Sequence, residues 1–335
     1  MFLAQRRDEE LQMPGMNGVG RVAFSLHILL TRWQWGLFPM VMLAVLIAIE
    51  IWYVQGVFDL AGRGRHWPVQ RTVAFVVGLV AVDLALQSPI ATLTGSYFQA
   101  HVVQHLLLMA VAPPLLALGA PSTLLLQTSS RKTKRRWLAV LRSRPFAVIS
   151  HPVTAWCLYF GVMYAFFLSP LINVAMHHMA LMDSLNLLFF FGGTLYWCPM
   201  VGIDPIVHWK MSYGVRMLNI LLATGTEAFL GVAIIASSKP AASMYTLSST
   251  RSGGGLLWMS TELVTLGAFI PIYIKWVHSE ERVAVRSDKR MSDEAALPED
   301  QRPPPNQALT PWAAEWLART GAVPQMSSNR TERGG

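Results

Sequence analysis

The feature that most constrains this chain is a series of seven apolar runs. Each is roughly 18 to 23 residues long, the length that a helix needs to cross a bilayer. The runs cover residues 35–54, 72–90, 98–119, 152–172, 181–202, 215–236 and 256–276. With 53% hydrophobic and 14% charged residues among 335, the composition excludes an ordinary soluble protein. The sequence therefore predicts an all-α fold, a polytopic membrane helix bundle with seven transmembrane helices, multi-pass in the cell membrane.

Composition divides the chain into three parts. An N-terminal tail covers residues 1–34, and its polar, Gly-rich first 20 residues lack the pattern of a signal peptide. The seven-helix transmembrane domain covers residues 35–278. A Pro-rich, charged C-terminal tail at 279–335 is predicted to be disordered, with a possible short helix at 310–320 capped by Thr310.

Basic loop residues predict the orientation of the bundle. Seven of them separate the third run from the fourth, at Arg131, Lys132, Lys134, Arg135, Arg136, Arg142 and Arg144. Such clusters remain on the cytoplasmic side, which places the N-terminus outside and the C-terminal tail in the cytoplasm. Because the net charge of +8 is concentrated in loops and tails, it reflects membrane orientation, and no nucleic-acid partner is expected.

The third run carries the most distinctive side chains. His101 and His105 are four residues apart, so on a helix they stack on one face, with Met109 one further turn along. An imidazole inside a bilayer needs a partner, and a functional role is the default hypothesis. A helical H-x-x-x-H pair suits a metal ion or a haem iron. Further along, Pro113 and Pro114 predict a kink or break.

Other polar residues are predicted at the depth of this histidine pair. They lie in the outer halves of their spans or in the short outer loop between the fourth and fifth runs. Gathering ionisable groups at one level makes sense if they pair or hold a cation together. The alternative for each is an ordinary interhelical hydrogen bond or a solvated loop position. We expect a metal-related site drawn from His101, His105, Asp83, His177, His178, Asp183, Glu262 and Met109.

The chemistry of the site leaves several functions open. Imidazole with thioether selects copper, whereas imidazole with carboxylate suits zinc, iron or copper. A haem-binding redox subunit would need axial histidines on opposite sides of the ring, usually from two helices. A copper or proton-coupled transporter would use Glu227, near the middle of the sixth run, as a relay. The chain has no nucleotide-binding loop, nucleophile elbow or H-E-x-x-H motif, so no enzyme is expected.

The segment FQAHVVQHLLLMAVAPPLLALGAP, residues 98–121, closely resembles the signature of the CtaG family of cytochrome c oxidase assembly factors. Two weaker blocks are also similar to that family, LFFFGGTLYWCPMVGIDP at 188–205 and GGGLLWMSTELVTL at 253–266. The chain departs from the family pattern at the start of the fifth run, where Asp183 and Asn186 stand in place of a histidine.

The resemblance implies a role in assembling a respiratory haem–copper oxidase. It implies handling or delivery of copper at the outer side of the membrane, with oxidase subunits and the lipid bilayer as partners. A labile copper site on His101 and His105 would serve that role. A scaffold that organises the oxidase without binding metal is a further alternative.

Overall fold

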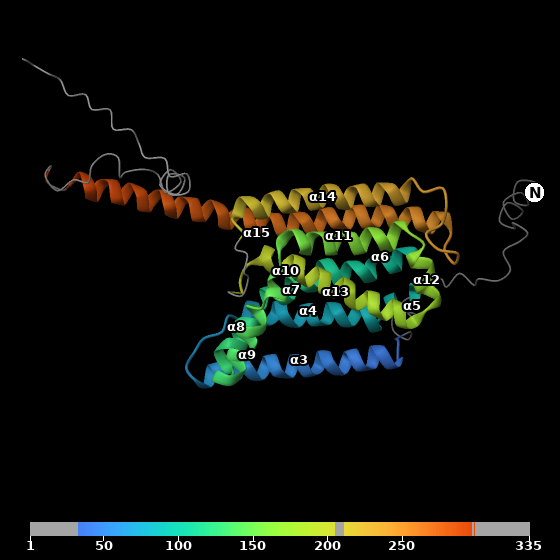
Figure 1. The fold of residues 1–335 in the computed structure, drawn as a ribbon, viewed down its shortest axis with the longest axis horizontal. Helices are drawn as coiled ribbons and strands as arrows, with labels where there is room; N and C mark the ends of the chain where they lie inside the picture. The colour runs from blue at the N-terminus through green and yellow to red at the C-terminus, as the bar shows by residue number, and fades with distance from the viewer. Residues whose placement is uncertain (1–32, 205–210, 297, 299–335) are drawn as a thin grey trace, which may run out of the picture. The chain divides into compact units, whose positions relative to one another are not determined.

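The structure, a computed structural model, describes residues 33–204, 211–296 and 298, and every regular element in these ranges is a helix (Figure 1). Among these described residues, six helices are long and apolar enough to cross a membrane, and a bent helix pair makes a seventh crossing if it counts as one span. The all-α membrane bundle predicted from sequence is therefore confirmed. The predictions made for residues 1–32 and for a short helix at 310–320 lie outside the described residues.

The first two crossings are α3 (Leu37–Gly62) and α4 (Val69–Gln87), which pack against each other. A short helix, α5 (Pro89–Leu93), follows α4 directly. Ser88 separates the two, because its hydroxyl accepts a hydrogen bond from the backbone N–H of Ile90 at 3.2 Å and the next residue is a proline at the first helical position. These features turn the chain toward the third crossing.

The third crossing is assembled from three pieces: α6 (Phe98–Leu106), a π-helical turn η1 (Leu107–Val111) and α7 (Ala112–Leu118). Pro113 and Pro114 lack the N–H groups that would continue the α-helical ladder. The kink or break predicted at these prolines takes the form of a wider turn just before them, and the crossing is not divided into two spans. Turns of this kind are frequent at functional sites.

Three short helices connect the third crossing to the fourth: α8 (Pro121–Thr128), α9 (Arg131–Leu141) and α10 (Arg144–Ile149). Asp204 anchors the start of α8. Its carboxylate accepts hydrogen bonds from the backbone N–H of Thr123 at 2.9 Å and from the hydroxyl of the same residue at 2.5 Å. A carboxylate at a helix N-terminus also interacts favourably with the helix dipole.

The fourth crossing is bent. It consists of α11 (Pro152–Leu168) and α12 (Leu171–His177), whose axes differ by 78°. The bend falls at Ser169 and Pro170, where the proline cannot donate to the α11 ladder and the serine hydroxyl accepts from the first N–H of α12 at 3.1 Å. The helix predicted over 152–172 therefore ends at Leu168, and its last residues belong to the bend and to the start of α12.

The remaining crossings are α13 (Met179–Val201), α14 (Tyr213–Ile235) and α15 (Leu247–Ala295). The part of α15 up to Tyr273 belongs to the same compact unit as the preceding helices, and the residues from Ile274 onward form a second unit. Residues 279–295 are helical, so the disordered tail predicted from residue 279 is corrected over this segment. The prediction weighed the charge of this segment and not its content of strong helix formers such as Glu, Arg, Lys and Ala.

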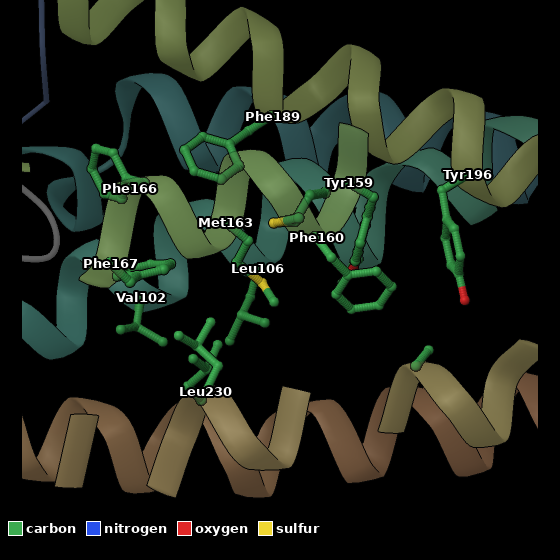
Figure 2. Close-up of a cluster of buried hydrophobic side chains, with 14 of the residues drawn as sticks. Val102, Leu106, Tyr159, Phe160, Met163, Phe166, Phe167, Phe189, Tyr196 and Leu230 are labelled. Atoms are coloured by element: carbon green, nitrogen blue, oxygen red, sulfur yellow. The ribbon is translucent and has the colours of Figure 1, made fainter. Parts of the chain in front are cut away.

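Buried apolar side chains form two clusters within the first unit. One cluster gathers side chains of α3, α4, η1, α7 and α8. The other joins α6, η1, α11, α12, α13, α14 and α15. Figure 2 shows part of this second cluster, in which Phe166, Phe167 and Phe189 lie at one end and Tyr196 at the other. The candidate site lies at the phenylalanine end.

Candidate functional site

His101 and His105 lie on the buried face of α6, with 0% and 1% of their surfaces exposed. The start of α6 is held by Ser249, whose hydroxyl accepts from the backbone N–H of Phe98 at 3.1 Å. One helical turn separates the two imidazoles, and their ring centroids are 4.8 Å apart. The stacking predicted from the four-residue spacing is confirmed.

Three phenylalanines enclose the pair, and we call them the aromatic cage: Phe166, Phe167 and Phe189. The ring of His105 lies 4.1 Å from Phe189, 4.7 Å from Phe166 and 5.9 Å from Phe167, between centroids. Phe166 also lies 5.3 Å from the ring of His101. The cage comes from α11 and α13, so helices distant in sequence together exclude water from the two imidazoles.

Within the part of the chain that the structure describes, three of the four ring nitrogens of the pair are buried without a hydrogen-bond partner. They are Nε2 of His101 and both Nδ1 and Nε2 of His105. Leaving a buried polar atom unpaired costs roughly 1–3 kcal/mol. Because native proteins satisfy most buried polar atoms, such a group calls for an explanation, and a role in binding an ion is one of the ordinary ones. The arrangement offers imidazole lone pairs to a ligand inside an apolar enclosure.

The fourth nitrogen, Nδ1 of His101, contacts a residue that the sequence did not point to. The Tyr245 hydroxyl lies 2.8 Å from it, 2.5 Å from the carbonyl oxygen of Thr94 and 3.8 Å from the sulfur of Met176. Burial raises the pKa of the Tyr245 phenol, so it remains a hydroxyl. Tyr245 lies in the loop before α15, 144 residues from His101. The available signal was indirect: the predicted orientation puts the loop between the sixth and seventh runs, which holds Tyr245, on the outer side with the start of the third run.

The structure does not bring the predicted acidic residues into one cluster with the pair. Glu262 is exposed on α15 and accepts a hydrogen bond from Trp258 Nε1 at 2.6 Å. Asp83 and Asp183 are half-buried, and one Asp83 oxygen has no hydrogen-bond partner among the described residues. Within the part of the chain that the structure describes, no three His, Cys, Asp or Glu side chains gather so that they could hold a metal ion.

The outer-loop histidines are also apart from the cage. His177 and His178 are both exposed, where α12 ends and α13 begins. The Nδ1 atom of His177 lies 2.7 Å from the backbone carbonyl of Asn173, one turn earlier on the same helix. Met109 is buried on η1. Of the predicted site residues, the structure therefore joins His101 and His105 closely.

Glu227 forms a separate buried polar site on α14. Its carboxyl accepts a hydrogen bond from the Tyr159 hydroxyl at 3.3 Å, and 6% of its surface is exposed. Tyr159 lies two turns from Phe166 along α11. Glu227, which the transporter alternative would use as a relay, thus has a tyrosine rather than the histidine pair as its hydrogen-bond partner.

Comparison with known proteins bears on the bundle from the middle of α3 onward. A family model described as cytochrome c oxidase caa3 assembly factor matches residues 51–279. This range contains the histidine pair, the aromatic cage and Tyr245.

Three similar curated proteins come from mycobacteria, and each carries the description "uncharacterized protein". One from Mycobacterium leprae is 28% identical over 264 residues, covering 73% of this chain and 40% of that protein. Those from Mycobacterium bovis and Mycobacterium tuberculosis are 27% identical over 285 residues, covering 80% of this chain and 42% of each protein. The chain thus spans about two fifths of the length of these relatives. No solved structure matches significantly.

Proposed function

Because the chain belongs to the cytochrome c oxidase caa3 assembly factor family, we propose that it handles copper destined for that oxidase. The copper is cargo, and His101 and His105 hold it within the membrane. With the N-terminus outside, this site lies toward the outer side of the cell membrane. Subunits of the oxidase are the receiving partners, and the protein acts without catalysing a reaction.

The observation that carries the proposal is the set of three unpartnered ring nitrogens inside the aromatic cage. Two neutral imidazoles one turn apart present lone pairs on one helix face. An ion that takes one lone pair from each ring would satisfy two of these three atoms, the third being the single N–H of a neutral His105. Nothing comparable is offered by the exposed His177 and His178.

The surroundings favour monovalent copper over a divalent ion. With no carboxylate grouped with the pair among the described residues, a divalent ion would bring two uncompensated charges into an apolar enclosure. A cuprous ion brings one charge, which an enclosure lined by the rings of Phe166 and Phe189 accepts at a lower desolvation cost. The thioether of Met176, next to Tyr245, is a soft donor of the kind that selects Cu(I).

The geometry disfavours the haem alternative. Axial histidines bind a haem from opposite sides, and the two imidazoles here lie on one helix face with ring centroids 4.8 Å apart. A porphyrin does not fit between rings at that separation, and phenylalanines fill the space around His105.

Copper loading of the purified full chain tests the proposal. Wild type, His101→Ala/His105→Ala and His177→Ala/His178→Ala are loaded with Cu(I) under reducing conditions, and bound copper is measured after gel filtration. His101→Ala/His105→Ala is expected to lose the bound ion. His177→Ala/His178→Ala, which removes the same number of imidazoles from exposed positions, is expected to retain it. Equal copper stoichiometry in all three proteins would show that His101 and His105 do not form the site. Oxidase assembly that survives the His101→Ala/His105→Ala substitutions would favour a metal-free scaffold.

A further inference from the structure

We propose that Tyr245 sets the tautomer of His101, so that the Nε2 atom of this imidazole carries the free lone pair. Tyr245 is thereby a positioning residue, because it acts on copper through His101. The inference deepens the proposed function and rests on it for its role in copper binding. The tautomer itself is a property of the metal-free protein and is testable without copper.

The first step concerns the single proton of the Tyr245 hydroxyl. The oxygen has three polar neighbours: the carbonyl of Thr94 at 2.5 Å, His101 Nδ1 at 2.8 Å and the sulfur of Met176 at 3.8 Å. A carbonyl oxygen only accepts, so two oxygens at 2.5 Å require a proton between them. A thioether at 3.8 Å is a weak competitor. The phenol proton therefore points to Thr94.

The second step follows for His101. Since the phenol O–H donates its hydrogen bond to the carbonyl of Thr94, the phenol oxygen can only accept from Nδ1. Nδ1 must therefore carry the hydrogen. A neutral imidazole has one N–H, so Nε2 holds the lone pair. This Nε2 atom is the nitrogen of His101 that is buried without a hydrogen-bond partner among the described residues. The atom left free by Tyr245 is thus the atom that a metal ion would use.

The third step concerns how firmly Tyr245 is held. Its ring contacts Phe98 edge to face, with centroids 5.5 Å apart, and its backbone N–H donates to the carbonyl of Ala242 at 3.1 Å. Only 4% of its surface is exposed. Hydrogen-bond partners of this kind fix ligand orientation, and their removal costs about 10- to 100-fold in metal affinity.

The test compares wild type, Tyr245→Phe and Tyr164→Phe in the full chain. Tyr164 makes a matched control because its hydroxyl also donates to a backbone carbonyl, that of Thr226 at 2.7 Å, and not to a histidine. Nitrogen-15 NMR of histidine-labelled, metal-free protein reports which ring nitrogen of His101 is protonated, with His101→Asn for assignment. Cu(I) affinity is measured by competition with a colorimetric chelator.

The expected result is an Nδ1-protonated His101 in wild type and Tyr164→Phe, and loss of that preference in Tyr245→Phe. Cu(I) affinity is expected to fall about 10- to 100-fold in Tyr245→Phe alone. An Nε2-protonated His101 in wild type overturns the inference whether or not copper binds, and it does so even if Tyr245→Phe fails to fold. A wild type that binds no copper but shows the expected tautomer overturns the proposed function and leaves the tautomer assignment supported.

Discussion

The contact between α13 and the third crossing leads to a sharp prediction about Gly193. A methyl group built on this glycine would lie 2.6 Å from the carbonyl oxygen and 2.7 Å from the Cα of Met109, and 2.9 Å from Cγ of Pro113. On Gly192, the neighbouring residue, a methyl would lie 3.8 Å from Leu158 Cγ, which is ordinary contact. Gly193→Ala should therefore force two crossings apart, and Gly192→Ala should be accommodated.

The size of the effect follows from these distances. The methyl of Gly193→Ala falls about 0.8 Å short of the 3.4 Å at which ordinary contact begins. Overpacking of this kind costs about 1–3 kcal/mol, and the upper part of the range applies because the nearest atoms are backbone. Both alanines gain about the same helix propensity, about 1 kcal/mol, so that gain cancels when the two variants are compared.

Unfolding of the purified protein in mixed micelles, followed by circular dichroism as the denaturing detergent is increased, measures the difference. Gly193→Ala should be less stable than Gly192→Ala by about 1–3 kcal/mol. Adding Met109→Ala should not restore Gly193→Ala, since the two closest atoms on Met109 belong to its backbone. Equal stability of the two single variants, or rescue by Met109→Ala, would refute the close approach of the two crossings.

Three further predictions concern the scaffold. Tyr53→Phe should destabilise the protein by about 1–3 kcal/mol in the same assay, because the buried hydroxyl donates to the carbonyl of Gly119 at 2.8 Å and its loss leaves that group unpaired; an unchanged transition would contradict it. Asp204→Ala should cost about 0.5–2 kcal/mol by removing the bonds to the start of α8, and Asp204→Asn should recover part of that loss. A reporter fused after Leu138 should lie in the cytoplasm, and a reporter outside would invert the proposed orientation.

Sequence reasoning located most of the crossings but not their irregularities. The predicted runs at 181–202 and 215–236 match α13 and α14 within two residues at each end, because the length of an apolar run is set by bilayer thickness. The 78° bend after Leu168 was not predicted, although the sequence contains Pro170 at that point. A proline can kink, break or start a helix, and tertiary packing decides between these outcomes.

For the candidate site, the sequence predicted the depth of each residue in the membrane but not the direction in which its side chain points around the helix axis. The position of a residue in a span gives its depth, and His101 and His105 could be paired because four residues on one helix share a face. Rotation about the helix axis is different. Spans that are apolar all round carry no periodic signal for the buried face, so Glu262 was expected near the pair and lies exposed. Tyr245 joins the site through a contact over 144 residues, which no local pattern encodes.

The π turn at Leu107–Val111 has a consequence for how relatives of this chain should be aligned. A π turn accommodates one residue more than the α-helical turn it replaces. The helical segments on either side therefore keep the same rotational orientation relative to each other despite the extra residue. A relative that lacks one residue here would still present its counterpart of His105 and its counterpart of α7 as this chain does. A one-residue gap elsewhere in the crossing would rotate one end by about 100° against the other. Insertions and deletions in this crossing should therefore concentrate at this turn.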